Sequence, residues 1–150
     1  MGIEKDIQQQ VFRNEYQKAT VNLIFTANWL TERIKIFLDH EEITSQQFNI
    51  LRILRGSKKP VSTLTIRERM LDKMSDTSRI VERLQKKGLV DKKICEIDKR
   101  KVDVEISKKG IALLEKLDRK NNELDNILSN LSNDQAKTLN SLLDRLREQS

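Results

Sequence analysis

The sequence contains one cysteine, Cys95, and one histidine, His40. A single cysteine cannot close an intrachain disulfide, and such a chain suits a reducing compartment. One cysteine and one histidine are too few for a His/Cys metal cluster within one chain, so we expect no metal site. Cys95 alternates with isoleucines, which favours a half-buried structural residue over a redox sensor.

Long apolar runs and catalytic motifs are absent as well. No stretch approaches the ~20 apolar residues that a membrane-spanning helix needs, and the N-terminal residues lack the apolar core of a signal peptide. The sequence has no Gly-rich phosphate loop, nucleophile elbow or HExxH motif. We therefore expect a cytoplasmic protein that is not an enzyme, has no membrane partner and needs no cofactor.

Residues that break helices are few, because the sequence has four glycines and one proline. Charged residues make up 35% of the chain and hydrophobic residues 37%. This balance is typical of a helix-rich protein with a charged surface. No repeat, low-complexity tract or linker marks a boundary, so we expect residues 1–150 to form one domain.

Positive charge is concentrated in the middle of the chain. The whole sequence has a net charge of +6. Residues 52–109 contain 18 Lys and Arg against 9 Asp and Glu, a net of +9, whereas the remainder has 11 against 14, a net of −3. A localised basic excess attracts polyanions and indicates a binding face. The alternative is an ordinary solvated surface.

The first half of the chain is expected to be helical. Apolar residues at three- and four-residue spacing predict one long helix, or two that abut, over about residues 6–39. A second helix is expected to begin after Thr44 or Ser45 and to end near Gly56. A short helix over about 63–71 follows. Its buried side is expected to contain Leu64, Met70 and Leu71.

A helix and a hairpin are expected next. The helix spans about residues 75–87 and ends at Gly88 after two lysines. Two strands, over 89–97 and 102–106, are joined by a basic tip at 98–101. This order of elements predicts a mainly α protein with a small β-hairpin, the layout of a winged helix-turn-helix.

The C-terminal part is expected to form two helices. Ser107 can cap a long helix that continues to Leu131, and Ser132 with Gln135 has the form of a capping box for a final helix. The apolar stripes at both ends of the chain exceed what a ~60-residue winged helix needs, so they either thicken a monomeric core or pack against a second copy. The residues expected to dimerise are Ile7, Val11, Leu124, Leu128, Leu131, Leu139, Leu142 and Leu146.

The exposed side of the 75–87 helix suits DNA. Short polar side chains at its start let a helix enter a major groove about 12 Å wide, where arginines reach bases or phosphates. The tip offers Arg100 to a narrow minor groove, and Asp98 is expected to pair with Arg100 and shape the loop. The alternative is a winged-helix adaptor that binds protein. The expected DNA contacts are Arg67, Ser75, Asp76, Thr77, Ser78, Arg79, Arg83, Lys86, Lys99, Arg100, Lys101 and Lys108.

Four short segments stand out in the chain: Arg-Ile-Val-Glu-Arg-Leu and Lys-Lys-Gly-Leu-Val within 79–90, Asp-Lys-Arg at 98–100, Val-Glu-Ile-Ser-Lys-Lys-Gly at 104–110, and Ile-Thr-Ser-Gln-Gln-Phe at 43–48. Together they resemble the MarR family of bacterial winged-helix transcriptional regulators. The resemblance covers about residues 23–146. The turn before the 75–87 helix departs from the family pattern, because it lacks the family's usual Gly-then-Ser signal.

The resemblance implies a homodimer with a winged helix at about 40–110 and dimerisation helices at about 5–38 and 111–148. It also implies a regulator, a repressor in our reading, that binds a pseudo-palindromic operator and responds to a small aromatic or phenolic effector. A pocket for that effector would include Phe25, Trp29 and Phe48, although apolar residues there are more often plain core. No cysteine lies in the first helix, so oxidant sensing by that route is not expected.

Overall fold

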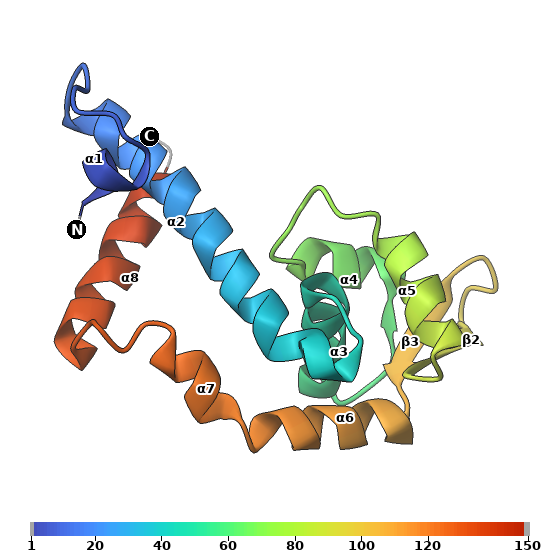
Figure 1. Ribbon diagram of the computed structural model, residues 1–150. Helices are drawn as coiled ribbons and strands as arrows, with labels where there is room; N and C mark the ends of the chain where they lie inside the picture. Colours follow the sequence, from blue (N-terminus) through green and yellow to red (C-terminus); the bar gives the residue numbers. More distant parts are fainter. Residues whose placement is uncertain (1, 149–150) are drawn as a thin grey trace. The chain divides into compact units, whose positions relative to one another are not determined.

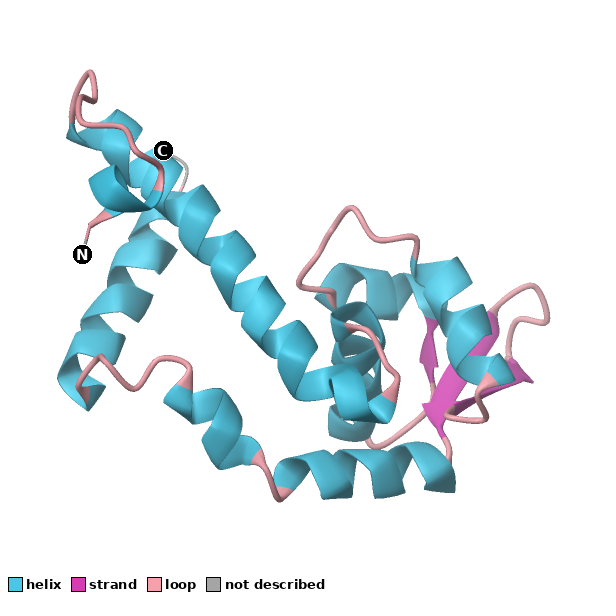
Figure 2. Ribbon diagram, viewed as in Figure 1, coloured by secondary structure: helices cyan, strands magenta, loops and turns pink. Residues whose placement is uncertain are grey.

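A computed structural model describes residues 2–148 of the protein, and the chain divides into two compact units. The first unit extends through Ser45 and the second begins at Gln46. Figure 1 shows the elements in chain order, and Figure 2 shows that the described chain is mainly helical with one small sheet. Among the described helices, none is both long and apolar enough to cross a membrane.

The first unit contains helix α1 (Ile3–Asp6), helix α2 (Glu15–Leu38) and the 3-10 helix η1 (Asp39–Glu41). The helix expected from about residue 6 is therefore wrong in its first part. Asn14 begins α2 because its side chain accepts a hydrogen bond from the Gln17 amide at 2.9 Å. Ile7 and Val11, predicted on that helix, lie outside α1 and α2.

The second unit combines helices with a three-stranded antiparallel sheet of order β1-β3-β2. Its elements are α3 (Ser45–Ser57), β1 (Val61–Ser62), α4 (Thr63–Arg69), α5 (Thr77–Lys86), β2 (Val90–Ile94), β3 (Val102–Ile106), α6 (Lys108–Asp118), α7 (Asn121–Asn126) and α8 (Asn133–Arg147). The sequence did not indicate β1, because it is two residues long and is defined by its pairing with β3. The expected class, mainly α with a winged hairpin, is confirmed.

The core of the second unit is built from apolar residues at helical and strand spacing. α3 buries Ile50, Leu51 and Leu54, which are at most 3% exposed. α5 contributes Val81 and Leu84. The other fully buried aliphatic side chains are Ile66, Val90, Val104, Leu114 and Leu117. Helices α3, α4, α5 and α6 therefore each present one apolar side to the core of the second unit.

The end of α5 is joined to the start of α6 by a set of hydrogen bonds. The amides of Gly88 and Leu89 donate to the carbonyls of Gln85 and Leu84, at 2.9 and 3.0 Å, which is the Schellman pattern at a helix C-terminus. Gly88 adopts φ 75°, a left-handed conformation that favours glycine. The Ser107 hydroxyl donates to the Gly88 carbonyl at 2.6 Å.

The start of α6 is held against the same residues. The Ser107 hydroxyl accepts from the Gly110 amide at 3.0 Å and so caps α6, while the Ser107 amide donates to the Leu89 carbonyl at 3.0 Å. A Cβ added to Gly110 would lie 2.4 Å from that Leu89 carbonyl oxygen. We call the residues Gly88, Leu89, Ser107 and Gly110 the helix junction.

The helix expected from Ser107 to Leu131 is interrupted. α6 ends at Asp118, α7 is a short helix, and residues 127–132 are not helical, so Leu128 and Leu131 lie outside α7 and α8. The leucine spacing is continuous here, but the segment is rich in Asn and Ser, which are weak helix formers. The capping box of α8 is confirmed, because the side chains of Ser132 and Gln135 accept from each other's backbone amides.

Two glycine-to-alanine substitutions should change stability in opposite directions. At Gly110 the new methyl group would meet the Leu89 carbonyl oxygen at 2.4 Å and Ile106 Cγ1 at 2.7 Å. We expect Gly110→Ala to lower the free energy of unfolding by about 2 kcal/mol, a typical cost of overpacking. Gly56 lies in α3 with no atom within 4 Å of an added Cβ. Gly56→Ala should raise the free energy of unfolding by about 0.5 kcal/mol.

Urea unfolding followed by circular dichroism would measure both changes. The same substitution is compared at two sites, so a general effect of alanine on the unfolded chain is controlled. A Gly110→Ala protein as stable as the parent would show that the close approach at the helix junction is not a constraint on the fold.

Candidate nucleic-acid interface

α5 is fixed at its first residue by Asp76. The Asp76 carboxylate accepts a hydrogen bond from the Arg79 amide at 3.2 Å, so the helix begins at Thr77, two residues after the start expected from the sequence. Val81 and Leu84 bury one side of the helix. The residues left exposed on its other sides include the predicted contacts Ser78, Arg79, Arg83 and Lys86.

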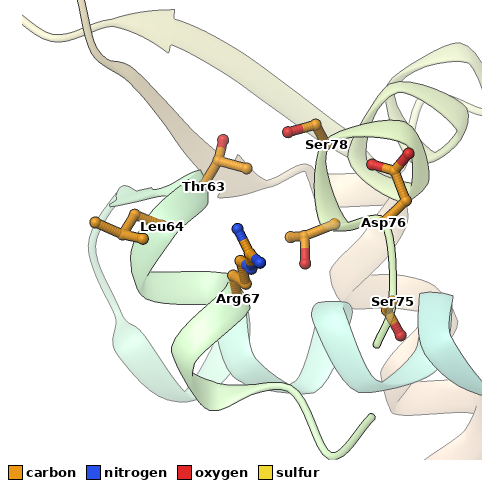
Figure 3. Close-up of a pocket in the computed structure, with 7 residues that line it drawn as sticks. Thr63, Leu64, Arg67, Ser75, Asp76 and Ser78 are labelled. Carbon is orange, nitrogen blue, oxygen red and sulfur yellow. The ribbon is translucent and has the colours of Figure 1, made fainter. Parts of the chain in front are cut away.

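The start of α5 and the first turns of α4 enclose an open pocket of about 460 Å³. Figure 3 shows the Arg67 guanidinium, on α4, extending into this pocket toward the start of α5. The structure therefore brings Arg67 together with the predicted residues at 75–78. We call this the α4–α5 pocket, and its lining residues are Thr63, Leu64, Arg67, Ser75, Asp76, Thr77 and Ser78.

Two residues of the α4–α5 pocket were missed by sequence reasoning. Thr63 and Leu64 lie in the first turn of α4, and Leu64 is 63% exposed although it was expected on the buried side. Leu71, expected to be buried with it, is also exposed. The four-residue spacing of Thr63 and Arg67 was the available signal, because it places both on one side of a helix.

Thr77 was predicted to contact DNA, and the structure corrects this. Its side chain is 4% exposed and lies on the buried side of α5. The Thr77 hydroxyl, like that of Ser75, is buried without a hydrogen-bond partner among residues 2–148. Thr77 therefore forms an inner wall of the pocket rather than part of the exposed surface.

The loop between β2 and β3 is shaped by Asp98. Its carboxylate accepts hydrogen bonds from the Arg100 amide and from Arg100 Nε, each at 3.1 Å, which confirms the predicted pair. The hydrogen bonds from the Arg100 side chain and backbone, with the nearby Lys101 charge, hold the pKa of Asp98 below its usual value. The Arg100 side chain is nevertheless 90% exposed, so the pair fixes its position without covering it.

Not every lysine of the hairpin adds net positive charge to its surface. Lys93 forms an ion pair with Glu105 at 2.6 Å, and that contact raises the pKa of Lys93. Lys99 and Lys101 form no ion pair with any residue that the structure describes, and both are exposed. The tip of the hairpin therefore carries positive charge that no described carboxylate neutralises. Lys108, in the first turn of α6, is also exposed.

The aromatic residues predicted for an effector pocket do not line either cavity described in the second unit. Phe25 and Trp29 are exposed on α2, and the Arg33 guanidinium lies 5.7 Å from the centre of the Trp29 ring. Phe48 is half-buried on α3, with Arg52 5.5 Å from its ring. Within residues 2–148 no group of three or more His, Cys, Asp or Glu side chains could hold a metal ion.

Part of this chain matches the sequence model of a known family, and most of the chain matches solved structures. The sequence model described as the MarR family matches residues 43–102. A cysteine-to-serine mutant of MarR from E. coli, complexed with operator DNA, has a TM-score of 0.82 and 21% identity, covering 93% of this chain and all 100% of that chain. No curated protein sequence matches this chain significantly.

Two further solved structures share the fold. A MarR transcription factor from Planctomyces limnophilus has a TM-score of 0.69 and 26% identity, covering 89% of this chain and 98% of that one. An organohalide-sensing transcriptional regulator in its 2,4-dichlorophenol-bound form has a TM-score of 0.82 and 19% identity, covering 93% and 85%. Residues 43–102 therefore match the sequence model of the MarR family, and the chain shares the winged-helix fold of these solved structures.

Proposed function

We propose that this protein is a sequence-specific DNA-binding transcription regulator that acts as a homodimer on a pseudo-palindromic operator. The observation that carries the proposal is the arrangement of exposed cations in the second unit. Arg79, Arg83 and Lys86 extend along α5, and the hairpin adds a braced Arg100. The operator-bound E. coli MarR structure, with a TM-score of 0.82, supports DNA as the ligand.

The two parts of this surface suit different parts of a duplex. An α-helix fits the major groove, where Arg79 and Arg83 can reach guanine edges or phosphates beside Ser78. The hairpin tip suits the minor groove, whose negative potential attracts arginine. Lys99 and Lys101 would then contact the phosphates on either side of the groove, and Lys108 a phosphate near the start of α6.

The α4–α5 pocket is suited to one backbone phosphate. Arg67 extends into it (Figure 3), and a guanidinium can donate two parallel hydrogen bonds to phosphate oxygens. The hydroxyls of the exposed Ser78 and the half-buried Thr63 are further donors on the pocket wall. Asp76 is not proposed to contact the phosphate, because its carboxylate caps α5 and would repel a phosphate. A contact of this kind positions α5 without reading sequence.

Dimerisation is supported by apolar surface at both ends of the chain. α8 has no buried residue, and its Leu139, Leu142 and Leu146 are 37%, 59% and 63% exposed. In α2, only Phe37 and Leu38 of 24 residues are buried. Helices with uncovered leucine stripes gain free energy by packing on another helix. The other residues proposed to dimerise are Ile7, Val11, Leu124, Leu128 and Leu131.

Repression and its release by an effector extend the same proposal. The regulator bound to 2,4-dichlorophenol has a TM-score of 0.82 with this chain, which supports a small aromatic or phenolic effector. Phe25, Trp29 and Phe48 are the aromatic residues proposed to contact it. A DNA-binding regulator acts in the cytoplasm, where we place this protein. A winged-helix adaptor that binds only protein would instead show little affinity for DNA at any salt concentration.

Salt dependence tests DNA binding and the role of Arg100 together. Because bound phosphates release counterions, six phosphate contacts should reduce the affinity for a duplex about a thousandfold between roughly 50 and 200 mM salt. Arg100→Ala should weaken binding and lower the slope of log affinity against log salt by about 1. Fluorescence anisotropy with a labelled duplex measures both quantities.

Lys137→Ala is the charge-matched control, because it removes one exposed cation from α8, outside the proposed surface. It should retain the parent slope. If Arg100→Ala and Lys137→Ala bind with the same affinity and slope, the hairpin does not contact DNA.

A charge on the apolar stripe of α8 tests the homodimer. Leu142→Asp would place a carboxylate in the proposed helix interface of both protomers, so the dimer dissociation constant should rise about a hundredfold or more. Sedimentation velocity should show a shift toward monomer. Ser141→Asp adds the same charge on the opposite side of α8 and should remain dimeric. A parent protein that sediments as a monomer would contradict the proposal directly.

A further inference from the structure

The apolar face of the hairpin continues beyond the core. Side chains alternate along a strand, so Val90, Lys92 and Ile94 lie on one face of β2, opposite Ile106, Val104 and Val102 of β3. At the base of the hairpin this face is core, because Val90 and Val104 are at most 1% exposed. At the far end the cross-strand pair of Ile94 and Val102 is 68% and 40% exposed.

Ile97 is a third exposed aliphatic residue, in the loop that follows the pair. Its side chain is 98% exposed, and it directly precedes Asp98, which holds Arg100. We call Ile94, Ile97 and Val102 the distal apolar surface. The cations Lys99, Arg100 and Lys101 belong to the loop that joins β2 to β3 (Figure 1), so apolar and basic residues occur together at one end of the hairpin.

We propose that the distal apolar surface packs against the deoxyribose edges of the DNA minor groove, on either side of the place where Arg100 enters. This inference rests on the proposed function. The walls of the minor groove are formed by sugar C–H groups, which are apolar, and their phosphates lie at its rim. A hairpin end that carries both aliphatic and cationic side chains matches that combination, and aliphatic side chains are a recurrent means of minor-groove contact.

The charge beside the surface favours DNA over a protein partner. Lys99 and Lys101 form no ion pair with the described residues, and Arg100 is 90% exposed despite its contact with Asp98. A polyanion neutralises all of these cations as it covers the isoleucines. The apolar contact releases no counterions, so its contribution to affinity should not depend on salt, unlike that of the cations.

Ile97→Ser in the full-length protein tests this difference. The probe is a labelled duplex about 30 base pairs long, enough for two half-sites one helical turn apart, taken from the genomic fragment that the parent protein binds best. Ile97→Ser should weaken binding about tenfold for each hairpin that contacts DNA, equally at every salt concentration and with an unchanged slope. Lys99→Ala should instead lower the slope by about 1.

Ile97→Leu is the matched control, because it keeps an aliphatic side chain of the same size and should bind like the parent. Since Ile97 is 98% exposed, its replacement removes no core packing, and circular dichroism would verify the fold. The inference is overturned if Ile97→Ser binds like the parent at every salt concentration, or changes the slope as Lys99→Ala does.

Sedimentation of the DNA-free proteins tests whether the distal apolar surface instead binds a second copy of the chain. A change in the oligomeric state of Ile97→Ser, with unchanged DNA affinity, would show that the surface binds a second copy of the chain and would overturn the inference. If the parent protein binds no duplex at all, the proposed function fails together with this inference. A parent that binds DNA while Ile97→Ser is unaffected overturns the inference alone.

Discussion

The helix junction is the constraint on which the candidate interface depends. Ser107 uses one hydroxyl to cap α6 and to bond the Gly88 carbonyl at the end of α5, while its amide bonds the Leu89 carbonyl. Gly110 then leaves room for that carbonyl. The end of α5, the base of the hairpin and the start of α6 are therefore held at one point. A displacement of any one of them breaks hydrogen bonds made by the others.

The helix junction fixes α5 more firmly than it fixes the tip of the hairpin. α5 is fixed at both ends, by the Asp76 cap and by the left-handed turn at Gly88, so the spacing of its exposed cations is set before any ligand binds. The hairpin is fixed at its base, but at its tip it is held mainly by the contacts of Asp98. A rigid helix suits base reading, and a tip held by local contacts suits a groove of variable width.

Sequence reasoning was reliable where structure is set by local hydrogen bonds. The caps Ser107 and Ser132 act within a few residues of themselves, so their chemistry can be read from the chain alone. β1 could not be predicted, because two residues become a strand only by pairing with β3. The α4–α5 pocket was found only in part for the same reason, since it arises from the approach of two helices whose separation no spacing pattern gives.

The errors at the chain ends have a common physical cause. Apolar periodicity is continuous through Ile7 and Val11, and again through Leu128 and Leu131, yet all four lie outside the helices. Periodicity reports which side chains need burial, whereas helix ends are decided by caps such as Asn14 and by weak helix formers such as Asn and Ser. Exposed aliphatic residues in non-helical segments still gain free energy from burial, and we propose that a second copy of the chain buries them. The irregular segments therefore belong in the same account of the dimer as α2 and α8.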